Sequence, residues 1–539
     1  MVTANNRRLT DADPSAGVAR RLPAQFRNQT LYILCSPLLG AGLHSLPRDL
    51  PPASAVLLVE LNRELAELQD DSRWEIAAIL NTQINWVTDV ATAQRQGEEH
   101  IRSRGIRAVE IVNLTGGARF ARERYQWLQH QLTAVVQQHW KNRGAMIRLG
   151  RRWITNTVQN SVQPVQPLSH LLAHIRAPVL LCGAGPQLDT HISWIKSVRT
   201  TCTVVALDTA LPTLAAVGIV PDVIWAMDGQ VANALDLMPW RWASVPVAVD
   251  LTAHPTFLRR FAPDQRYAFL TEYTDPLPVS AVLPRDIPLL PPRGSVAPSA
   301  VEGLVRWCRV RHILSVGVDF WYRTPKSHSS MSAPHRGVLH RHDRLTGTGG
   351  DPRLLMRPMV DVRLRDGTAA RGDAILADQA AQLAHTVATL RHEFPDFECY
   401  SLGQSGLHTG MPPVSPAWAA QWLNAGSHNR RTVEEGRTTA LGAVVSDAPA
   451  LPQALRALVS ALRVQEERIL SNPTGPIFLC DDVRFVLLDL PQWPLLELQQ
   501  EWVQLHRGAI LRSLRDYRRR FEHQLARCVA PGTRPETGA

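Results

Sequence analysis

The chain has 539 residues, 45% of them hydrophobic, and a formal net charge of +10 from 58 basic and 48 acidic residues. This composition can build a sizeable core, and a typical domain length of about 150 residues predicts about three domains. The longest apolar runs are far shorter than the ~20 residues that cross a bilayer, and the N-terminus lacks the apolar segment of a signal peptide. The sequence therefore argues against a disordered chain and a membrane span, and it predicts a cytoplasmic protein.

The cysteines and the excess positive charge carry little functional information. No two of the seven cysteines form a CxxC pair, which predicts reduced core residues. The basic excess, largely arginine in helical segments, leaves two interpretations open: a solvated basic face, or a surface for an anionic ligand or partner. No nucleic-acid-binding motif accompanies the charge, so nucleic acid is not expected as a partner.

The N-terminal part begins with a polar leader, residues 1–28, followed by a predicted Rossmann-like lobe over residues 29–160. In this lobe a strand at 31–35 leads through a glycine-containing turn to a second strand at 55–59, which ends at Glu60. An acidic side chain about twenty residues after such a turn can bind ribose hydroxyls. Two interpretations remain open, a purely structural lobe and a second nucleotide or methyl-donor site.

Further along the lobe we expect a strand at 108–112 and an amphipathic helix at 119–140. The prolines of segment 163–168 mark a boundary, because proline removes amide donors and resists helix continuation. A central domain is predicted over residues 165–412. Its expected elements begin with strand 179–182, helix 190–198, strand 202–207, helix 211–217, strands 223–227, 245–249 and 267–270, helix 299–310 and strand 312–316.

From residue 324 to 372 the sequence is rich in Gly, Pro, Arg and His, which predicts a long loop excursion of the kind that forms lids or binding loops. Helical periodicity returns at 374–392, and a strand is expected at 397–401. Residues 413–539 are predicted to form a C-terminal helical domain, with the clearest helices at 451–470 and 495–528. The fold class is therefore α/β: a Rossmann-like lobe, a central doubly wound, mostly parallel sheet and a helical domain.

The most informative stretch is the glycine turn after strand 179–182. Gly183 and Gly185 let the backbone approach a ligand closely, and the following helix points free amides at the turn, which predicts a phosphate cradle. Asp208 and Asp228 follow two further strands and are expected at the same sheet edge. The turn alone is also compatible with a structural role. No Walker sequence occurs, so a P-loop ATPase is not supported.

Several short motifs, in order, resemble the motility accessory factor (Maf) glycosyltransferases of flagellated bacteria, whose central domain is similar to the archaeal 6-hydroxymethylpterin diphosphokinase MptE. The resemblance spans roughly residues 165 to 415. The matching segments are Gly183-Ala-Gly-Pro-Gln-Leu-Asp189, which resembles GxGPSLD with Gln187 in place of serine, Asp208-Thr-Ala-Leu211, Gly218-Ile-Val-Pro-Asp222 with Met227-Asp228, Gly294-Ser-Val296, Gly317-Val-Asp-Phe320 with His328, and Tyr400 to Gly406 followed by Gly410.

This resemblance implies a glycosyltransferase that moves a nonulosonic, sialic-like sugar from a CMP-activated donor to Ser or Thr hydroxyls of flagellin, in support of flagellar assembly and motility. No tightly bound cofactor is expected, and the nucleotide-sugar is a substrate. The implied catalytic residues are His328 as general base, Asp228 and Asp319. The implied nucleotide-binding residues are Gly183, Gly185, Pro186, Gln187, Asp208, Asp222, Asn233, Gly294 and Ser295, and Ser295, Tyr322 or Arg323 are candidate donors to the CMP phosphate.

Other interpretations stay open. In an MptE-like pyrophosphokinase, Asp208, Asp222 and Asp228 would hold Mg²⁺ on ATP, and pyrophosphate would pass to a pterin alcohol. A degenerate member could instead bind flagellin without catalysis. His328 is also compatible with a surface position in a histidine-rich loop. The spacing of the histidines in that loop matches no zinc pattern, so no metal site is predicted.

Overall fold

The structure is a computed structural model, and it describes residues 3–4, 7–40, 43, 46, 50–51, 53–67, 84–176, 178–237, 242–272, 286–322, 326–340, 356–428, 450–472 and 506–529. The chain divides into two compact units. The first contains the described residues up to Arg148 together with 506–509, and the second contains 149–472 and 510–529. The division falls inside the long helix α5 (Arg122–Ser161) rather than near residue 160.

The first unit is built on a parallel four-stranded sheet in the order β5-β4-β3-β6. A sheet in which the first strand lies between the second and the fourth is typical of one half of a Rossmann fold, so the expected Rossmann-like lobe is confirmed. The described elements before α5 are β1 (Thr3–Ala4), β2 (Arg7–Arg8), α1 (Pro14–Arg21), β3 (Thr30–Cys35), β4 (Ala55–Val59), α2 (Arg63–Glu67), β5 (Ile84–Val87), α4 (Val90–Arg104) and β6 (Ala108–Asn113).

Glu60, at the end of β4, is fully buried inside this lobe. Its carboxylate accepts hydrogen bonds from the Ser36 hydroxyl at 2.7 Å and from the Asn62 amide at 3.0 Å. Burial raises the pKa of this carboxyl group above its usual value. Because both oxygens are bound by the protein, the structure favours the purely structural interpretation of the lobe over a ribose site.

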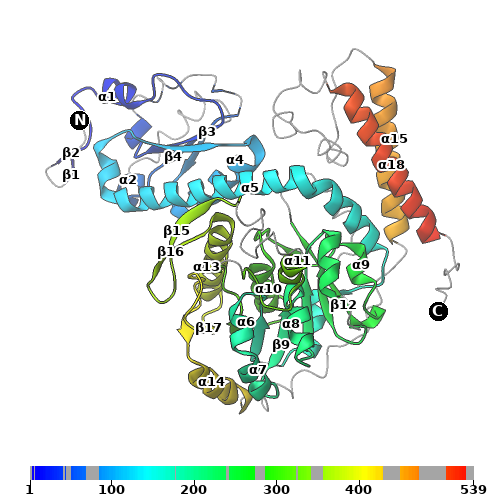
Figure 1. Ribbon diagram of the computed structural model, residues 1–539. Coiled ribbons are helices and arrows are strands. Elements are labelled where there is room, and N and C mark those ends of the chain that lie inside the picture. The colour runs from blue at the N-terminus through cyan, green and yellow to red at the C-terminus, as the bar shows by residue number, and fades with distance from the viewer. Residues whose placement is uncertain are drawn as a thin grey trace. The chain divides into compact units, whose positions relative to one another are not determined.

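The second unit is built on a parallel sheet (Figure 1). Its strand order is β13-β12-β11-β10-β9-β8-β14-β17-β18, with β7 also pairing with β12. Its strands are β7 (Gln166–Pro167), β8 (Val179–Cys182), β9 (Thr203–Leu207), β10 (Val223–Ala226), β11 (Val247–Asp250), β12 (Arg266–Thr271), β13 (Leu289–Leu290), β14 (His312–Val316), β17 (Glu398–Leu402) and β18 (Pro413–Val414). Its α-helices up to β18 are α6 (Gln187–Thr190), α7 (Ile192–Val198), α8 (Leu211–Ala216), α9 (Pro255–Leu258), α10 (Val296–Arg306), α11 (Ala333–Leu339) and α13 (Ala374–Glu393).

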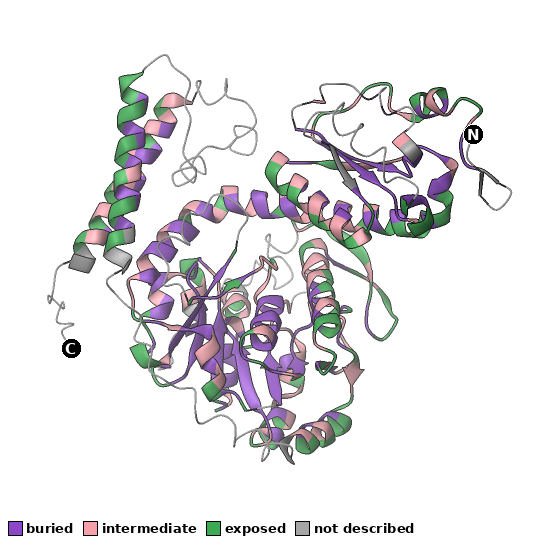
Figure 2. Ribbon diagram, turned by 180° about the vertical axis from the view of Figure 1, so that it is seen from behind, coloured by how far each residue is buried: buried purple, intermediate pink, exposed green. Residues whose placement is uncertain are grey.

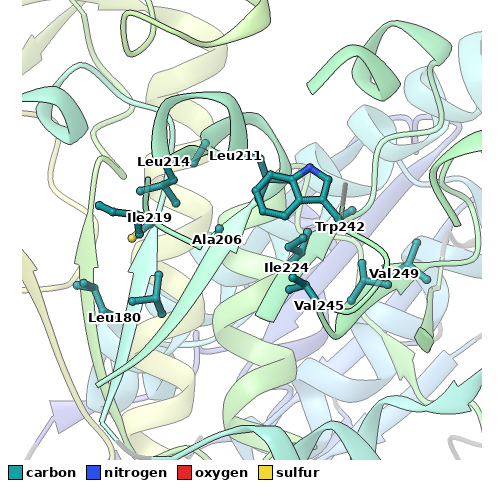
Figure 3. Close-up of a cluster of buried hydrophobic side chains, with 14 of the residues drawn as sticks. Leu180, Ala206, Leu211, Leu214, Ile219, Ile224, Trp242, Val245 and Val249 are labelled. Atoms are coloured by element: carbon teal, nitrogen blue, oxygen red, sulfur yellow. The ribbon is translucent and has the colours of Figure 1, made fainter. Parts of the chain in front are cut away.

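Both faces of this sheet are covered by apolar side chains, which is why its strands read as continuous hydrophobic runs. On one face, Leu180 and Ile224 pack with Trp242 and the α8 leucines (Figure 3). On the other face, Trp225 packs beneath α10, where a Cβ atom on Gly303 would lie 2.3 Å from the indole ring. The central strands are buried along their length (Figure 2). The predicted doubly wound parallel fold is confirmed.

The sheet continues past residue 412. Strand β18 pairs with β17, and α14 (Pro416–His428) packs against α7, with the Trp194 indole donating to the Pro416 carbonyl at 2.9 Å. The double proline therefore lies inside the sheet and not at a domain boundary.

Two further helices, α15 (Ala450–Ser471) and α18 (Arg507–Val529), lie side by side and antiparallel. They are joined by ion pairs of Arg463 with Glu522 and of Arg515 with Glu466.

The predicted excursion at 324–372 contains regular structure among its described residues. It includes α11 and a hairpin of β15 (Met359–Arg363) and β16 (Ala369–Asp373), in which Gly367 adopts a positive φ. The side chains of this hairpin are mostly exposed, those of Met359 and Val360 included, so its strands lack the buried apolar face by which a strand is recognised in a sequence. None of the described helices combines the length and apolar character that crossing a bilayer requires.

Candidate functional site

The site lies where the winding of the sheet reverses. Strands β8 and β14 are neighbours, but the chain proceeds from β8 toward β13 on one side and from β14 toward β18 on the other. In open parallel sheets, ligands bind outside the carboxyl ends of the strands at such a switch point. We call this region the carboxyl-edge site, and it comprises the segments 183–189, 208–210, 227–237, 317–322 and 326–332.

The glycine turn after β8 packs directly against the loop after β14. The Gly183 amide donates to the Val316 carbonyl at 2.8 Å, and the Gly185 amide donates to the Gly317 carbonyl at 2.7 Å. A Cβ atom on Gly183 would lie 2.5 Å from the Gly317 oxygen. The glycines are thus required for the close approach of two loops.

This geometry corrects the predicted phosphate cradle. Besides the two glycine amides, the Gln187 amide at the start of α6 donates to Asp319 Oδ2 at 2.9 Å. The protein itself therefore uses three of the amides that were expected to hold phosphate. The Gln187 side chain lies beside Gly403 and His191 rather than over the turn, since its Oε1 is 3.0 Å from where a Gly403 Cβ would be.

Asp319, a predicted catalytic residue, has contacts typical of a structural residue. The side chain is only 3% exposed and fills the space beside Gly185. Burial raises its pKa to about 6, an effect opposed by the Gln187 amide and the nearby Arg365 guanidinium. Arg365 in turn donates to the Val318 and Leu407 carbonyls. These contacts fix the loop after β14 against α6.

His328 belongs to a segment, residues 326–332, that is docked on the glycine turn. The Ser329 amide donates to the Ala184 carbonyl at 2.8 Å, and the Ser329 and Thr213 hydroxyls lie 2.7 Å apart. Asp189 binds the other side of the segment through Lys326 at 2.6 Å and the Ser330 amide at 2.9 Å. The structure thus brings His328 to the carboxyl-edge site, as the sequence predicts.

The imidazole of His328 is in its neutral form at pH 7. Burial first, and then the positive charge of Arg357, lower its pKa to about 4. Its Nδ1 lies 3.0 Å from the Ser327 hydroxyl. Arg357 forms an ion pair with Asp373 at 2.6 Å. Burial, and then the charge of Asp373, raise the pKa of the nearby Tyr322, and the charge of Arg357 lowers it. A neutral imidazole can accept a proton. Arg323 lies outside the described residues.

Asp208 and Asp228 meet at the ends of β9 and β10. Asp208 is 3% exposed, and burial, together with the charge of Asp228, raises its pKa to about 6. Its Oδ1 accepts the Thr209 amide at 2.8 Å. Asp228 accepts the Gln230 amide and the Asn233 side-chain amide, each at 2.8 Å. The two aspartates and Asn233 are thus brought together as the sequence predicts.

Two asparagines of α5, which the sequence analysis did not predict, donate hydrogen bonds to the loops that follow β10 and β11. Asn156 donates to the Gly229 and Thr252 carbonyls at 3.1 and 2.9 Å. Asn160 donates to the carbonyls of Leu251 and Ala253. Both are buried. The sequence feature that could have predicted these contacts is the spacing of the two asparagines, which places them four residues apart on one face of the helix.

A third acidic residue, Asp236, also belongs to the cluster and was not predicted. It lies in the short helix η6 (Val231–Leu237), which packs against the turn that carries Asp208. The side chain is 3% exposed. Burial first, and then the charges of Asp208 and Asp228, raise the pKa of Asp236 to about 8. At neutral pH its carboxyl group therefore carries a proton.

The raised pKa of Asp236 predicts a pH-dependent stability difference. A carboxyl pKa raised by folding adds stability that is full below its usual value near 4 and is lost as the pH rises through about 8. Asp236→Asn, which stays neutral, should therefore gain thermal stability relative to the unchanged protein from pH 5 to pH 8, by roughly 5 °C at the upper end. A melting-temperature difference that does not vary with pH would contradict this.

Asp222 does not belong to the site. It precedes β10 instead of following it, and so lies at the amino ends of the strands, on the opposite edge of the sheet from Asp208 and Asp228. Arg199 binds both of its oxygens at 2.9 and 2.8 Å, and the Val204 amide donates to it at 2.7 Å. The predicted nucleotide-binding and magnesium roles of Asp222 are therefore not supported by its position.

A hollow of about 920 Å³ lies at this amino edge, with cations on its wall. Lys196 is in the last turn of α7 and Arg199 follows that helix, where positive charge stabilises the helix carbonyl end. We therefore interpret this basic wall as structural and distinguish it from the carboxyl-edge site. Its charged and polar lining residues include His174, Arg176, Lys196, Arg199, Thr200 and Asp222.

Replacing Asp222 with alanine tests this assignment. We expect a loss of about 1–3 kcal/mol in the free energy of unfolding, because the Val204 amide and Arg199 each lose a partner. Asp361→Ala is the control, since the Asp361 side chain is 97% exposed and its ion pair with Arg371 is long, at 4.0 Å. Chemical denaturation measures both variants. Equal stability of Asp222→Ala and the unchanged protein would contradict a structural role for Asp222.

Gly294 and Ser295 lie at the start of α10, after edge strand β13. Gly294 has a φ of +69°, and its carbonyl accepts the Gln379 side-chain amide at 3.2 Å. Ser295 is the N-cap residue of α10 but makes no side-chain capping bond. Helices of parallel sheets begin at the carboxyl edge, so this helix start is on the same edge as the aspartates, several strands away.

The magnesium set predicted for the pyrophosphokinase interpretation is not assembled, because Asp222 is paired with Arg199 at the other edge. Within the described parts of the chain, no three His, Cys, Asp or Glu side chains are grouped closely enough to share a metal ion. His342 of the histidine-rich segment lies outside those parts.

Three comparisons agree with this architecture. A family model described as 6-hydroxymethylpterin diphosphokinase MptE-like matches residues 151–325. A protein of Treponema pallidum (strain Nichols), described as uncharacterized, is 26% identical over 406 residues, which cover 73% of this chain and 68% of that protein. The structure of a Maf glycosyltransferase from Magnetospirillum magneticum AMB-1 matches with a TM-score of 0.50 and 14% identity, covering 96% of this chain and 83% of that one. The predicted resemblance to a Maf-like fold with an MptE-like domain is confirmed.

Proposed function

We propose that this protein is a glycosyltransferase that moves a nonulosonic sugar from a CMP-activated donor to serine or threonine hydroxyls of flagellin. The observation that carries the proposal is the docking of segment 326–332 on the glycine turn, which places a neutral His328 at the carboxyl-edge site. The likeness in fold to a Maf glycosyltransferase and the ordered sequence motifs support the choice of reaction.

In the proposed step, the acceptor hydroxyl oxygen forms a bond to the anomeric carbon of the sugar. The bond between that carbon and the phosphate oxygen of CMP breaks, and CMP leaves with the bonding electron pair. The hydroxyl proton passes to a ring nitrogen of His328. This role suits an imidazole that is uncharged at neutral pH.

The acidic residues of the site suit the nucleoside part of the donor. Asp208 follows the strand after the glycine turn, and in nucleotide-binding sheets an acidic residue at this position binds ribose hydroxyls. Asp228 and Asn233, joined by a hydrogen bond of 2.8 Å, provide further polar groups beside it. The phosphate belongs on the side of Tyr322 and Arg357, away from the carboxyl groups, because like charges repel.

The proposal is tested by incubating the purified protein with CMP-activated nonulosonic acids and flagellin and weighing the flagellin by intact-protein mass spectrometry. We expect a mass increase of one or more sugar residues and release of CMP. A parallel reaction with ATP, Mg²⁺ and 6-hydroxymethylpterin tests the pyrophosphokinase alternative. Flagellin binding without product in either reaction would support a non-catalytic binding factor and contradict the transferase.

A further inference from the structure

The most unusual polar group of the second unit is the carboxyl group of Asp236. The side chain is 3% exposed, yet its Oδ1 has no hydrogen-bond partner among the described residues. The carboxyl group accepts a backbone hydrogen bond from the Ala333 amide of α11. Buried oxygens are nearly always bonded, and an unbonded one costs about 1–3 kcal/mol. Such an oxygen therefore indicates a missing partner.

The surroundings of Asp236 combine close packing with converging acidic side chains. Asp236 interacts electrostatically with Asp208 and Asp228, the residues that end β9 and β10. The helix η6 that carries it packs against α8, α9 and α11 as well as against the Asp208 turn. Among the described residues, Arg152 acts on Asp228 with its positive charge, and no ion pair joins Asp208, Asp228 or Asp236 to a basic side chain. Three carboxyl groups thus converge at this point.

The chemistry of the cluster selects a hydroxyl group as the missing partner. A hydroxyl both donates and accepts, so it can satisfy a carboxyl oxygen in either protonation state, whereas a phosphate beside three acidic groups would be repelled. Asp228 already accepts from Gln230 and Asn233, and Asp208 accepts from Thr209. Asp236 Oδ1 is the carboxyl oxygen of the cluster that is buried without a partner among the described residues.

We propose that Asp236 binds a ribose hydroxyl of the donor nucleotide through its unpartnered Oδ1. The inference rests on the proposed function, which supplies the CMP moiety, and it extends that function by a residue that no sequence motif marks. Ribose is the sugar that the position of Asp208 selects, because the charge of Asp208 acts on Asp236 and η6 packs against the turn that carries Asp208, at the end of the strand that follows the glycine turn. Asp236 then fixes the orientation of the nucleoside.

The test compares the affinities of CMP, 2′-deoxy-CMP and 3′-deoxy-CMP by calorimetric titration. Asp236→Ala should weaken the binding of CMP about tenfold, the effect of one hydrogen bond at the strong end of the range. For the analogue that lacks the contacted hydroxyl, the unchanged protein and the variant should bind equally. Asp236→Asn keeps an acceptor for the Ala333 amide, and it should show a smaller loss of the same selectivity even if the alanine variant does not fold.

Asp250→Asn is the matched control. Asp250 is equally buried and ends the neighbouring strand β11, but both of its oxygens are bound, by the Thr252 amide and the Thr271 hydroxyl. This variant should bind CMP normally. Equal affinity of Asp236→Ala and the unchanged protein for CMP, or equal weakening for all three nucleotides, would overturn the inference alone. Absence of CMP binding by the unchanged protein would overturn the proposed donor and the inference with it.

Discussion

Gly317→Ala is expected to destabilise the second unit by more than about 3 kcal/mol and to lower the yield of folded protein sharply. Gly317 has a φ of +67°, and a Cβ atom there would lie 2.3 Å from the Gly183 oxygen and 3.0 Å from the Leu188 Cβ. Neither neighbour can move freely, because both are held by backbone hydrogen bonds. The Gly183 amide donates to the Val316 carbonyl, and the Leu188 amide donates to the Gly185 carbonyl. The two loops would have to separate.

Gly218→Ala separates the two causes of this loss. Gly218 has a φ of +76°, similar to that of Gly317, but no atom of the described residues beyond its chain neighbours lies within 4 Å of the added Cβ. This variant should lose only the conformational term of about 1–2 kcal/mol. Denaturation monitored by circular dichroism measures both. Equal losses for the two variants would mean that the loops after β8 and β14 are not closely packed.

His328→Gln is expected to reduce the rate of sugar transfer at least 100-fold while leaving the folding transition nearly unchanged. General-base catalysis contributes about 10² to 10⁴ in rate, and glutamine cannot take the proton. Because the pKa of His328 is lowered to about 4, the rate of the unchanged protein should be constant from pH 6 to 8 and fall only as the pH approaches 4. The measurement is the initial rate of CMP release across this pH range.

His340→Gln is the control for His328→Gln, because His340 belongs to the same histidine-rich region but is exposed beyond the end of α11. Its transfer rate should match that of the unchanged protein. A His328→Gln variant with a normal rate would show that another group accepts the proton. A normal rate with a raised KM would instead assign His328 to binding.

The parallel sheet could be predicted from the sequence because its strands are continuous apolar runs of the right length. Val179–Cys182 and His312–Val316 are bounded as expected. The motif order also predicted that the glycine turn, Asp208, Asp228 and His328 would come together. These residues follow strands or belong to a loop that follows one, so the topology alone places them at one edge.

The errors arose where a motif residue precedes its strand or where a contact joins distant segments. Asp222 stands at the start of β10, so the same parallel topology sends it to the opposite edge. The partner of Gly185 is Gly317, more than a hundred residues away, and no local pattern shows that the turn is filled by this loop. Asp236 lies in a short helix with no motif, and only the packing of η6 shows its burial.

The central claim, that a CMP-activated donor binds at the carboxyl-edge site, is tested most directly by hydrogen–deuterium exchange with and without CMP. The account predicts slower exchange in segments 183–189, 208–210, 227–237 and 326–332, and no change at the amino-edge residues 196–203 and 217–222. Protection confined to those amino-edge residues would place the nucleotide in the basic hollow instead, and would contradict the account.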